Sequence, residues 1–405
     1  MFNDNLVING KKLVFVAEKA DFEAAMKDLE KHKSFAIDTE FDRNRSRYGF
    51  NVCVIQIATE KTCYIIDPLA VAKGAAMNVA LKSLWDLISS DKHLKIIHAL
   101  GEDIRLFAKY GAVSRCFFDT KLAAETLCIK GGDSFKTLLK TVLDKEVDKS
   151  LQKTNWFERP LTAQHLLYLA NDVVYLHQIK EAMEQELKTA QREEWFAEEM
   201  DFGLRLEDNI NHDAEIQSLK NKQEYRNFSD SQQFLFEKLW HARDQAAQKA
   251  DKPPFYIFPN EALFQIADNA RDFIAAPSFR GFYKTFQMVE NQAFFIQQLD
   301  AWLTEAANLK LSTVWQRPKY DADKPFFDRT KAKDTALRIF APIKDFLREK
   351  YGEDTEKRLL SNRKIEQIAF EESLDSLPLY VRREIEAAAK ESNTNISKYL
   401  KIKEL

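Results

Sequence analysis

Two carboxylates stand two residues apart in a segment with the composition of a buried strand. Asp38 and Glu40 lie in FAIDTEF (35–41), among aromatic and β-branched residues. Side chains at positions i and i+2 of a strand project from one face, so the two acids repel each other unless a cation lies between them. A divalent metal suits this position because hard cations prefer oxygen ligands. A D-x-E pair also occurs at solvent-facing strand ends, so the pair alone decides nothing.

Three further residues extend this pattern. Asp103 enters the first turn of a helix after the strand-like run KIIHA, where the helix dipole alone could explain an acid but where α/β sheets also place their sites. Tyr168 and Asp172 in YLAND are one helical turn apart and share one face. An amphipathic tyrosine beside an exposed acid is the ordinary alternative for that pair. Taken jointly, the strand pair, the strand-end acid and the helical Y-x-x-x-D form a specific pattern.

An alternating α/β region must position these residues. Short runs rich in β-branched and aromatic residues predict strands at 13–16, 35–41, 52–58, 63–67 and 95–99. Helix-spaced apolar positions lie between them at 21–31 and 79–89. These signals indicate a mixed sheet with flanking helices. From residue 120 onward only helical spacing is found, and Thr162 is a candidate N-cap.

The later part of the chain reads as helical throughout. A heavily charged stretch precedes a new helical unit that starts near Ser229, and a third helical region covers roughly 333–390. We expect four segments, of which the first is the α/β domain, the second a packing helix with a connector, and the last two are all-helical. Their expected limits are 1–190, 191–227, 228–310 and 311–405.

Composition restricts the class of protein. The 405 residues are 45% apolar and 30% charged, as expected for a folded chain of two or three domains. The net charge of −3 argues against a bulk nucleic-acid binder but not against a local nucleic-acid cleft. The four cysteines form no C-x-x-C pair, and we find no export signal or membrane-length apolar run. We therefore expect a cytoplasmic protein that is not attached to a membrane.

The motifs resemble the DEDD superfamily of 3′→5′ exonucleases, in the subclass with tyrosine in the third motif, and are most similar to the ribonuclease D family. FAIDTEFDRNRSRY, IIHALGEDIRLF and SLQKTNWFERPLTAQHLLYLANDVVYL match its three motif blocks in order, and DTKLAA (119–124) matches a further segment. FLFEKLWHARDQAAQKADKPPFYIFPNEALFQIA resembles the helicase-and-RNase-D C-terminal (HRDC) domain. IKDFLREKYGEDTEKRLLSNRKIEQIA resembles a second, divergent copy. The glycine and leucine pattern expected after Ala276-Pro277 is blurred, which leaves the later helices of the first copy in doubt.

This resemblance implies a ribonuclease H-like exonuclease domain followed by two all-α HRDC-like domains. It implies that Asp38, Glu40, Asp103 and Asp172 hold two divalent cations, Mg²⁺ or Mn²⁺, and that Tyr168 orients the attacking water. RNA 3′ ends, such as the single-stranded tail of a tRNA precursor, would be trimmed to nucleoside 5′-monophosphates. No required protein partner is evident, and we expect a monomer.

Several other residues are candidate substrate contacts, and for each of them a structural role is also open. They are Thr39, Phe41, Arg43, Gln56 and His98. Phe41 could stack on a terminal base or belong to the core. Arg43 begins a run of alternating arginines that an extended backbone would present to phosphates. Gln56 could bond the terminal ribose or a neighbouring backbone group, and His98 could act as general base or be structural.

Three other functions stay open at this point. The carboxylates do not distinguish DNA from RNA, since only contacts to the 2′-OH would do so. The chain could also be a non-catalytic nucleic-acid-binding protein on the same scaffold, although all five motif residues are present. An enzyme acting on small phosphorylated metabolites is a third alternative, which the HRDC-like segments disfavour.

Overall fold

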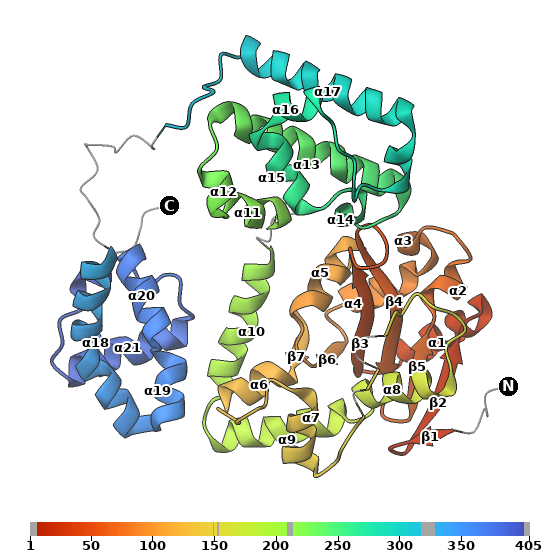
Figure 1. The fold of residues 1–405 in the computed structure, drawn as a ribbon. Coiled ribbons are helices and arrows are strands. Elements are labelled where there is room, and N and C mark those ends of the chain that lie inside the picture. Colours follow the sequence, from red (N-terminus) through yellow and green to blue (C-terminus); the bar gives the residue numbers. More distant parts are fainter. Residues whose placement is uncertain (1–5, 149, 152–153, 209–213, 317–328, 401–405) are drawn as a thin grey trace.

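The computed structural model describes residues 6–148, 150–151, 154–208, 214–316 and 329–400 (Figure 1). An α/β domain with seven strands is followed by two groups of helices, and the long helix α10 lies between the α/β domain and the last group. Among the described helices, none combines the length and apolar composition that a membrane span requires.

The sheet is mixed, as the sequence predicts. Its strand order is β1-β2-β5-β4-β3-β6-β7, in which β3 pairs antiparallel with β4 and parallel with β6. The strands are β1 (Val7–Ile8), β2 (Lys11–Val16), β3 (Ser34–Arg43), β4 (Phe50–Ala58), β5 (Thr62–Ile66), β6 (Leu94–Ile97) and β7 (Phe117–Asp119). The five expected strands are present, but β1 and β7 are too short to carry an alternating signal.

Helices cover both faces of this sheet. The helices of the α/β domain are α1 (Lys19–Leu29), α2 (Pro68–Ala72), α3 (Met77–Ala80), α4 (Lys82–Ser89), α5 (Gly101–Lys109), α6 (Thr120–Thr126), α7 (Phe135–Leu143), α8 (Ala163–Val173) and α9 (Leu176–Thr189). Helices α6 to α9 pack on the face that carries Ala36 and Val54, whereas α1, α4 and α5 pack on the face that carries Phe35 and Ile37. The helix expected at 79–89 is divided into α3 and α4 at Leu81.

Helix α10 (Glu193–Asp208) joins the α/β domain to the helical groups. Its residues Met200 and Leu204 are buried in the core on the α5 side of the sheet, while Trp195 is buried in the core of the last helical group. The packing helix expected within the connector segment is therefore α10.

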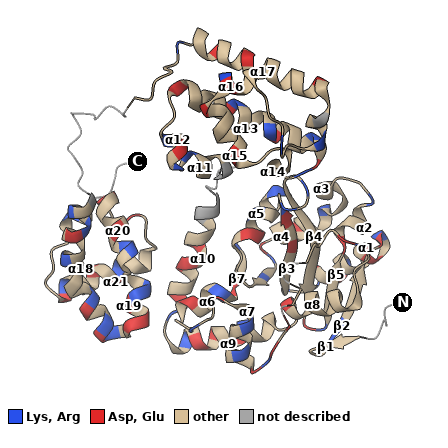
Figure 2. Cartoon of the chain, in the orientation of Figure 1, with Lys and Arg blue, Asp and Glu red and all other residues tan. Residues whose placement is uncertain are grey.

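Two helical modules follow, each around its own core. The first helical module comprises α11 (Ala214–Lys220), α12 (Gln223–Arg226), α13 (Asp230–Ala250), α14 (Pro254–Ile257), α15 (Asn260–Asp268), α16 (Ala270–Ala275), η1 (Lys284–Gln287) and α17 (Val289–Asn308). The second helical module comprises α18 (Arg329–Tyr351), α19 (Glu353–Leu359), α20 (Asn362–Glu371), α21 (Leu379–Glu391) and η2 (Ser397–Tyr399). Residues of both signs, Lys and Arg as well as Asp and Glu, are interspersed along the helices of both modules, as Figure 2 shows.

Candidate active site

Strand β3 carries the first two acids on one face of the sheet. Asp38 and Glu40 alternate with Thr39 and follow Ala36, which is buried on the α8 side. Asp38 is paired with Gln56 of β4, and the register shifts between Glu40 and Phe41. The two acids therefore face α8, at the end of a strand that is irregular just beyond them.

Helix α8 brings Tyr168 and Asp172 to the same face. Thr162 caps its N-terminus: the Thr162 hydroxyl accepts a hydrogen bond from the His165 amide at 3.2 Å, and the His165 ring accepts one from the Thr162 amide. Tyr168 and Asp172 are each 7% exposed. Burial, and then the charges of Asp172, Glu40 and Asp38, raise the pKa of the Tyr168 phenol above its ordinary value. The structure thus brings the three acids within electrostatic reach of the Tyr168 phenol.

Asp103 approaches β3 from the other side. It lies in the first turn of α5, whose apolar residues pack in the opposite core, and its carboxylate accepts a hydrogen bond from the Thr39 hydroxyl. Burial raises the pKa of the Asp103 carboxyl to about 7, against the lowering effect of the Thr39 hydrogen bond. The fifth motif residue is therefore next to the strand that carries Asp38 and Glu40, but is held by the residue between them.

Four carboxylates give an all-oxygen donor set of the kind that hard divalent cations prefer, so the residue types fit Mg²⁺ or Mn²⁺. The charges of three of these carboxylates, Asp38, Glu40 and Asp172, raise the pKa of the Tyr168 phenol. With the side chains as placed, the described residues contain no group of three acid, histidine or cysteine side chains close enough to share one ion. Asp103 contacts Thr39 on the opposite face of β3, which separates its carboxylate from the other three.

Two parts of the chain match known protein families. Residues 13–188 match the 3′-5′ exonuclease family, and residues 232–270 match the HRDC domain. The ribonuclease D of Shewanella sp. strain ANA-3 is 32% identical over 186 residues, which is 46% of each chain. That of Bartonella henselae is 26% identical over 266 residues, covering 65% of this chain and 63% of the relative. The chain therefore contains a 3′-5′ exonuclease domain, and its sequence is similar to those of ribonucleases D.

Solved structures support the fold. Escherichia coli RNase D, described as an exoribonuclease involved in structured RNA processing, superposes with a TM-score of 0.67 over 94% of this chain and 99% of its own, at 18% identity. The catalytic core of RRP6 from Trypanosoma brucei gives a TM-score of 0.57 over 75% of this chain and 82% of its own, at 19% identity. The first curated relatives are matched over about half to two thirds of their own length.

Against this family background, the candidate substrate contacts separate into two groups. Gln56 is fully buried on the face of Asp38, and among the described residues neither of its amide atoms has a hydrogen-bond partner. His98 contacts the Thr120 hydroxyl at 3.0 Å, and its other ring nitrogen lies 3.3 Å from the Asp133 carbonyl oxygen. Gln56 thus keeps unused hydrogen-bonding capacity, whereas His98 is fixed by its neighbours.

Phe41 and Arg43 are engaged within the protein. Phe41 packs edge-on against Phe50 with ring centroids 5.0 Å apart. Arg43 forms an ion pair with Glu102 at 2.6 Å.

The arginines that follow β3 do not lie on an extended backbone, which is one of the two alternatives that the sequence leaves open. The Asp42 carboxylate accepts hydrogen bonds from the amides of Arg45, Ser46 and Arg47, and this folds the segment into a turn. Arg47 pairs with Asp251 of the first helical module, so the arginines diverge.

Sequence reasoning missed two supporting residues of the exonuclease domain. Trp156 packs against Tyr168 with ring centroids 5.8 Å apart. Arg159 donates to the Trp156 carbonyl at 2.7 Å and forms a two-point ion pair with Asp67, at 2.6 and 2.9 Å. The motif NWFERPLT contains both residues, but no local spacing rule connects them to a tyrosine on the next helix.

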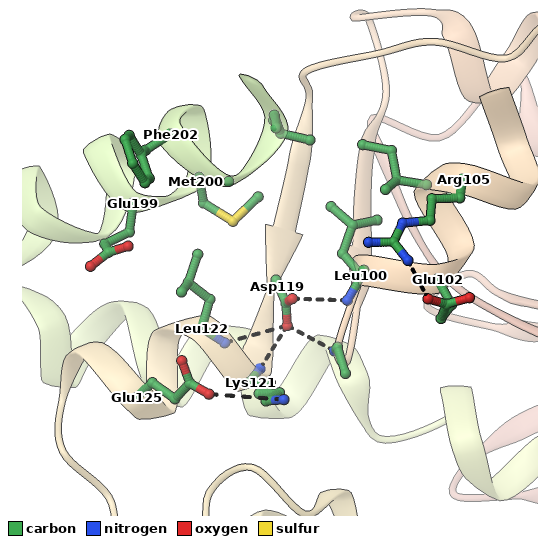
Figure 3. A pocket seen from close by; sticks show the side chains of 15 residues that line it. Leu100, Glu102, Arg105, Asp119, Lys121, Leu122, Glu125, Glu199, Met200 and Phe202 are labelled. Carbon is green, nitrogen blue, oxygen red and sulfur yellow. Dashed lines mark hydrogen bonds and ion pairs between the residues drawn. The ribbon is translucent and has the colours of Figure 1, made fainter. Parts of the chain in front are cut away.

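A cavity of about 560 Å³ lies beside α5, α6 and α10 rather than over the five motif residues. In Figure 3, Asp119 lies between α5 and α6, and accepts hydrogen bonds from Leu100 and Lys121 amides at 2.9 and 2.8 Å. Its carboxylate also accepts from the amide of Ala99, which has a left-handed φ of 67°. Asp119, another residue not singled out in the sequence, therefore fixes the turn that leads to Asp103.

Proposed function

We propose that this protein is a 3′→5′ exoribonuclease that releases nucleoside 5′-monophosphates by hydrolysis. The observation that carries the proposal is the position of Tyr168, whose phenol is buried within electrostatic reach of Asp38, Glu40 and Asp172. The exonuclease match over 13–188 includes all five motif residues, which supports the same reading.

Tyr168 acts as a hydrogen-bond donor in this proposal. Burial and the adjacent acids disfavour the phenolate, so the hydroxyl keeps its proton at neutral pH. A phenol in this state can donate to the attacking water and orient it toward the terminal phosphate. Trp156 packs against the ring and limits its freedom, because its own position is fixed through Arg159.

The four acids provide the proposed metal site. Asp38, Glu40, Asp103 and Asp172 would hold two Mg²⁺ or Mn²⁺ ions. When bound, these ions would neutralise charge on the phosphate and lower the pKa of the attacking water. Calorimetric titration with Mn²⁺ tests the binding independently of hydrolysis: the heat should be lost in Asp38→Ala and retained in Asp86→Asn, which removes an exposed acid on α4.

RNA is proposed as the substrate because the relatives are ribonucleases D and because E. coli RNase D acts in structured RNA processing. Gln56 is the proposed sugar contact, since its buried amide lies beside Asp38 in the sheet and could bond a ribose hydroxyl. We also propose Thr39, Phe41, Arg43 and His98 as contacts to the RNA. For the segment 311–405, we propose a second, divergent HRDC-like domain.

The test is degradation of matched single-stranded RNA and DNA of one sequence, labelled at the 5′ end, with EDTA as control. We expect RNA to be shortened from its 3′ end, and Asp172→Asn to abolish this shortening while the circular dichroism spectrum is retained. Asp86→Asn serves as the matched acid control. Equal activity of Asp172→Asn would refute the site, and preference for DNA would refute the substrate.

A further inference from the structure

Two neighbouring aromatic side chains are exposed on the short helix α14 of the first helical module. Phe255 and Tyr256 of α14 are 49% and 53% exposed, with ring centroids 5.0 Å apart. The adjacent residues Ile257 and Phe258 are each only 1% exposed, and Pro254 is buried. The segment is therefore anchored on its inner side, and it holds two rings outward in a fixed position.

This aromatic pair lies where the helical module meets the exonuclease domain, as the position of α14 in Figure 1 shows. Asp251, four residues before Phe255, pairs with Arg47 at 2.5 Å. The Tyr48 hydroxyl donates to Asp244 of α13 at 2.8 Å. Arg47 and Tyr48 belong to the turn that follows β3. These two contacts therefore connect the segment before the aromatic pair to the strand that carries Asp38 and Glu40.

Aromatic contacts lead from this turn back to the active site. The Arg47 guanidinium lies 5.2 Å from the centre of the Phe157 ring. Phe157 follows Trp156, which packs against Tyr168 at a centroid separation of 5.8 Å. Rings and one cation thus connect Tyr168 with the edge of the first helical module at which Asp251 lies.

We propose that Phe255 and Tyr256 form a stacking platform for single-stranded nucleic acid several nucleotides upstream of the 3′ end. The inference rests on the proposed function, and it names the part of the substrate that this surface would hold. Bases stack on exposed aromatic rings regardless of sequence, while nearby cations attract the phosphates.

The charges around the platform favour a polynucleotide over an apolar protein partner. Lys249 and Lys252 precede the two rings by a few residues, and Asp251 between them is already paired with Arg47. This local surplus of positive charge, combined with two rings tilted by 48°, suits a flexible strand whose bases can adopt different angles.

The test compares substrates of two lengths. Hydrolysis and binding of an unstructured 12-nucleotide RNA and of a 3-nucleotide RNA are measured on the full chain with Phe255→Ala, Tyr256→Ala and both. Binding is followed by fluorescence anisotropy in the Asp172→Asn background. Stacking is worth about 1–3 kcal/mol per base, so each ring lost should weaken binding of the 12-nucleotide RNA by at least about fivefold. For the 3-nucleotide RNA, the loss in kcat/KM should stay within about twofold.

Two controls keep the result interpretable. Phe294→Ala removes another ring of the same module, 62% exposed on α17, and should leave 12-nucleotide binding at the wild-type value. Tyr256→Phe keeps the ring and should restore the affinity that Tyr256→Ala loses. Circular dichroism verifies that each variant is folded.

The outcomes distinguish the inference from the proposed function. Wild-type hydrolysis with 12-nucleotide binding unaffected in the double variant overturns the platform alone. Equal losses for both RNA lengths also overturn it, because they indicate a change at the active site. If the chain hydrolyses neither RNA nor DNA but loses RNA binding when the two rings are removed, the platform is supported and the proposed function is overturned.

Discussion

The two helical modules are attached to the exonuclease domain by different kinds of contact. The first helical module meets it through the turn after β3, where Arg47 and Asp251 are each about half exposed. The second helical module encloses Trp195 of α10, which stacks on Tyr380 with centroids 5.0 Å apart, and it also receives ion pairs from the same helix. The first attachment consists of an exposed ion pair and the partly buried Tyr48, which packs against the edge of the module's core, whereas the second is centred on a buried aromatic stack.

This difference shows that chain order does not set the strength of attachment. The module nearer in sequence is joined by contacts that solvent weakens, because exposed ion pairs contribute little. The more distant module buries a tryptophan and partly buried charges against α10, which is itself packed on the sheet. We therefore expect the second module to unfold or separate less readily than the first, and four variants or conditions test this.

The largest effect should come from Trp195→Ala. This change removes a ring that is 8% exposed and lies between Tyr380 and Tyr351, so we expect a loss of about 3–5 kcal/mol in the stability of the second helical module. Differential scanning calorimetry with limited proteolysis measures it. Trp315→Ala, at a position 45% exposed, is the control. A loss below about 1 kcal/mol would remove the asymmetry between the attachments.

Breaking the Arg358–Glu199 pair should have the next largest effect. The two side chains are 15% and 16% exposed and lie 3.2 Å apart, so Arg358→Met leaves a partly buried carboxylate beside the Tyr380 hydroxyl. We expect about 2 kcal/mol of destabilisation, measured by urea denaturation. A double-mutant cycle with Glu199→Gln isolates the pair, and additive effects would show that the two residues are not coupled.

Acid should weaken the exonuclease domain through His177 of α9. Burial, followed by the charges of Lys11 and Lys180, lowers the pKa of His177 to about 4 from an ordinary 6.5. Because the unfolded chain takes up this proton first, stability is complete above pH 6.5 and falls as the pH drops toward 4, by about 2 kcal/mol at pH 5. His177→Phe should remove this part of the pH dependence in denaturant titrations. An unchanged pH slope would contradict the assignment of this effect to His177. If both helical modules lost the same stability in acid, they would not unfold separately from the exonuclease domain.

The smallest effect should follow from Arg47→Met. Both partners of the Arg47–Asp251 pair are about half exposed, so the stability change should stay below about 1 kcal/mol at physiological salt. Thermal unfolding at low and high ionic strength measures it, with Lys82→Met, in an exposed pair on α4, as control. A change above about 2 kcal/mol would place the first attachment in the same class as the second.

Local signals predicted much of the fold and of the site. The cap Thr162, the start of a helical unit near Ser229, the strand containing Asp38 and Glu40, and the helix containing Tyr168 all follow from spacing and side-chain type over a few residues. The helix break at Leu81 interrupts an apolar periodicity that continues across it, and so it left no sequence signal.

The contacts that separate the two attachments were not predictable from one sequence. Arg358 and Glu199 are 159 positions apart, and Arg47 and Asp251 are 204 positions apart. The direction taken by Asp103 depends on Thr39, which lies on the other face of β3 from the two acids beside it. Periodicity assigns each residue to a face, but it does not identify the partner on another element.

Helix α10 has a practical consequence for isolating the catalytic unit. Phe196 packs against Phe118 of β7 at a centroid distance of 4.7 Å, and Met200 and Leu204 complete the core on the other face. A fragment cut where the exonuclease family match ends, at residue 188, would expose this apolar surface to water. A minimal soluble nuclease should therefore extend through α10, with Trp195, which faces the absent module, replaced by a polar residue.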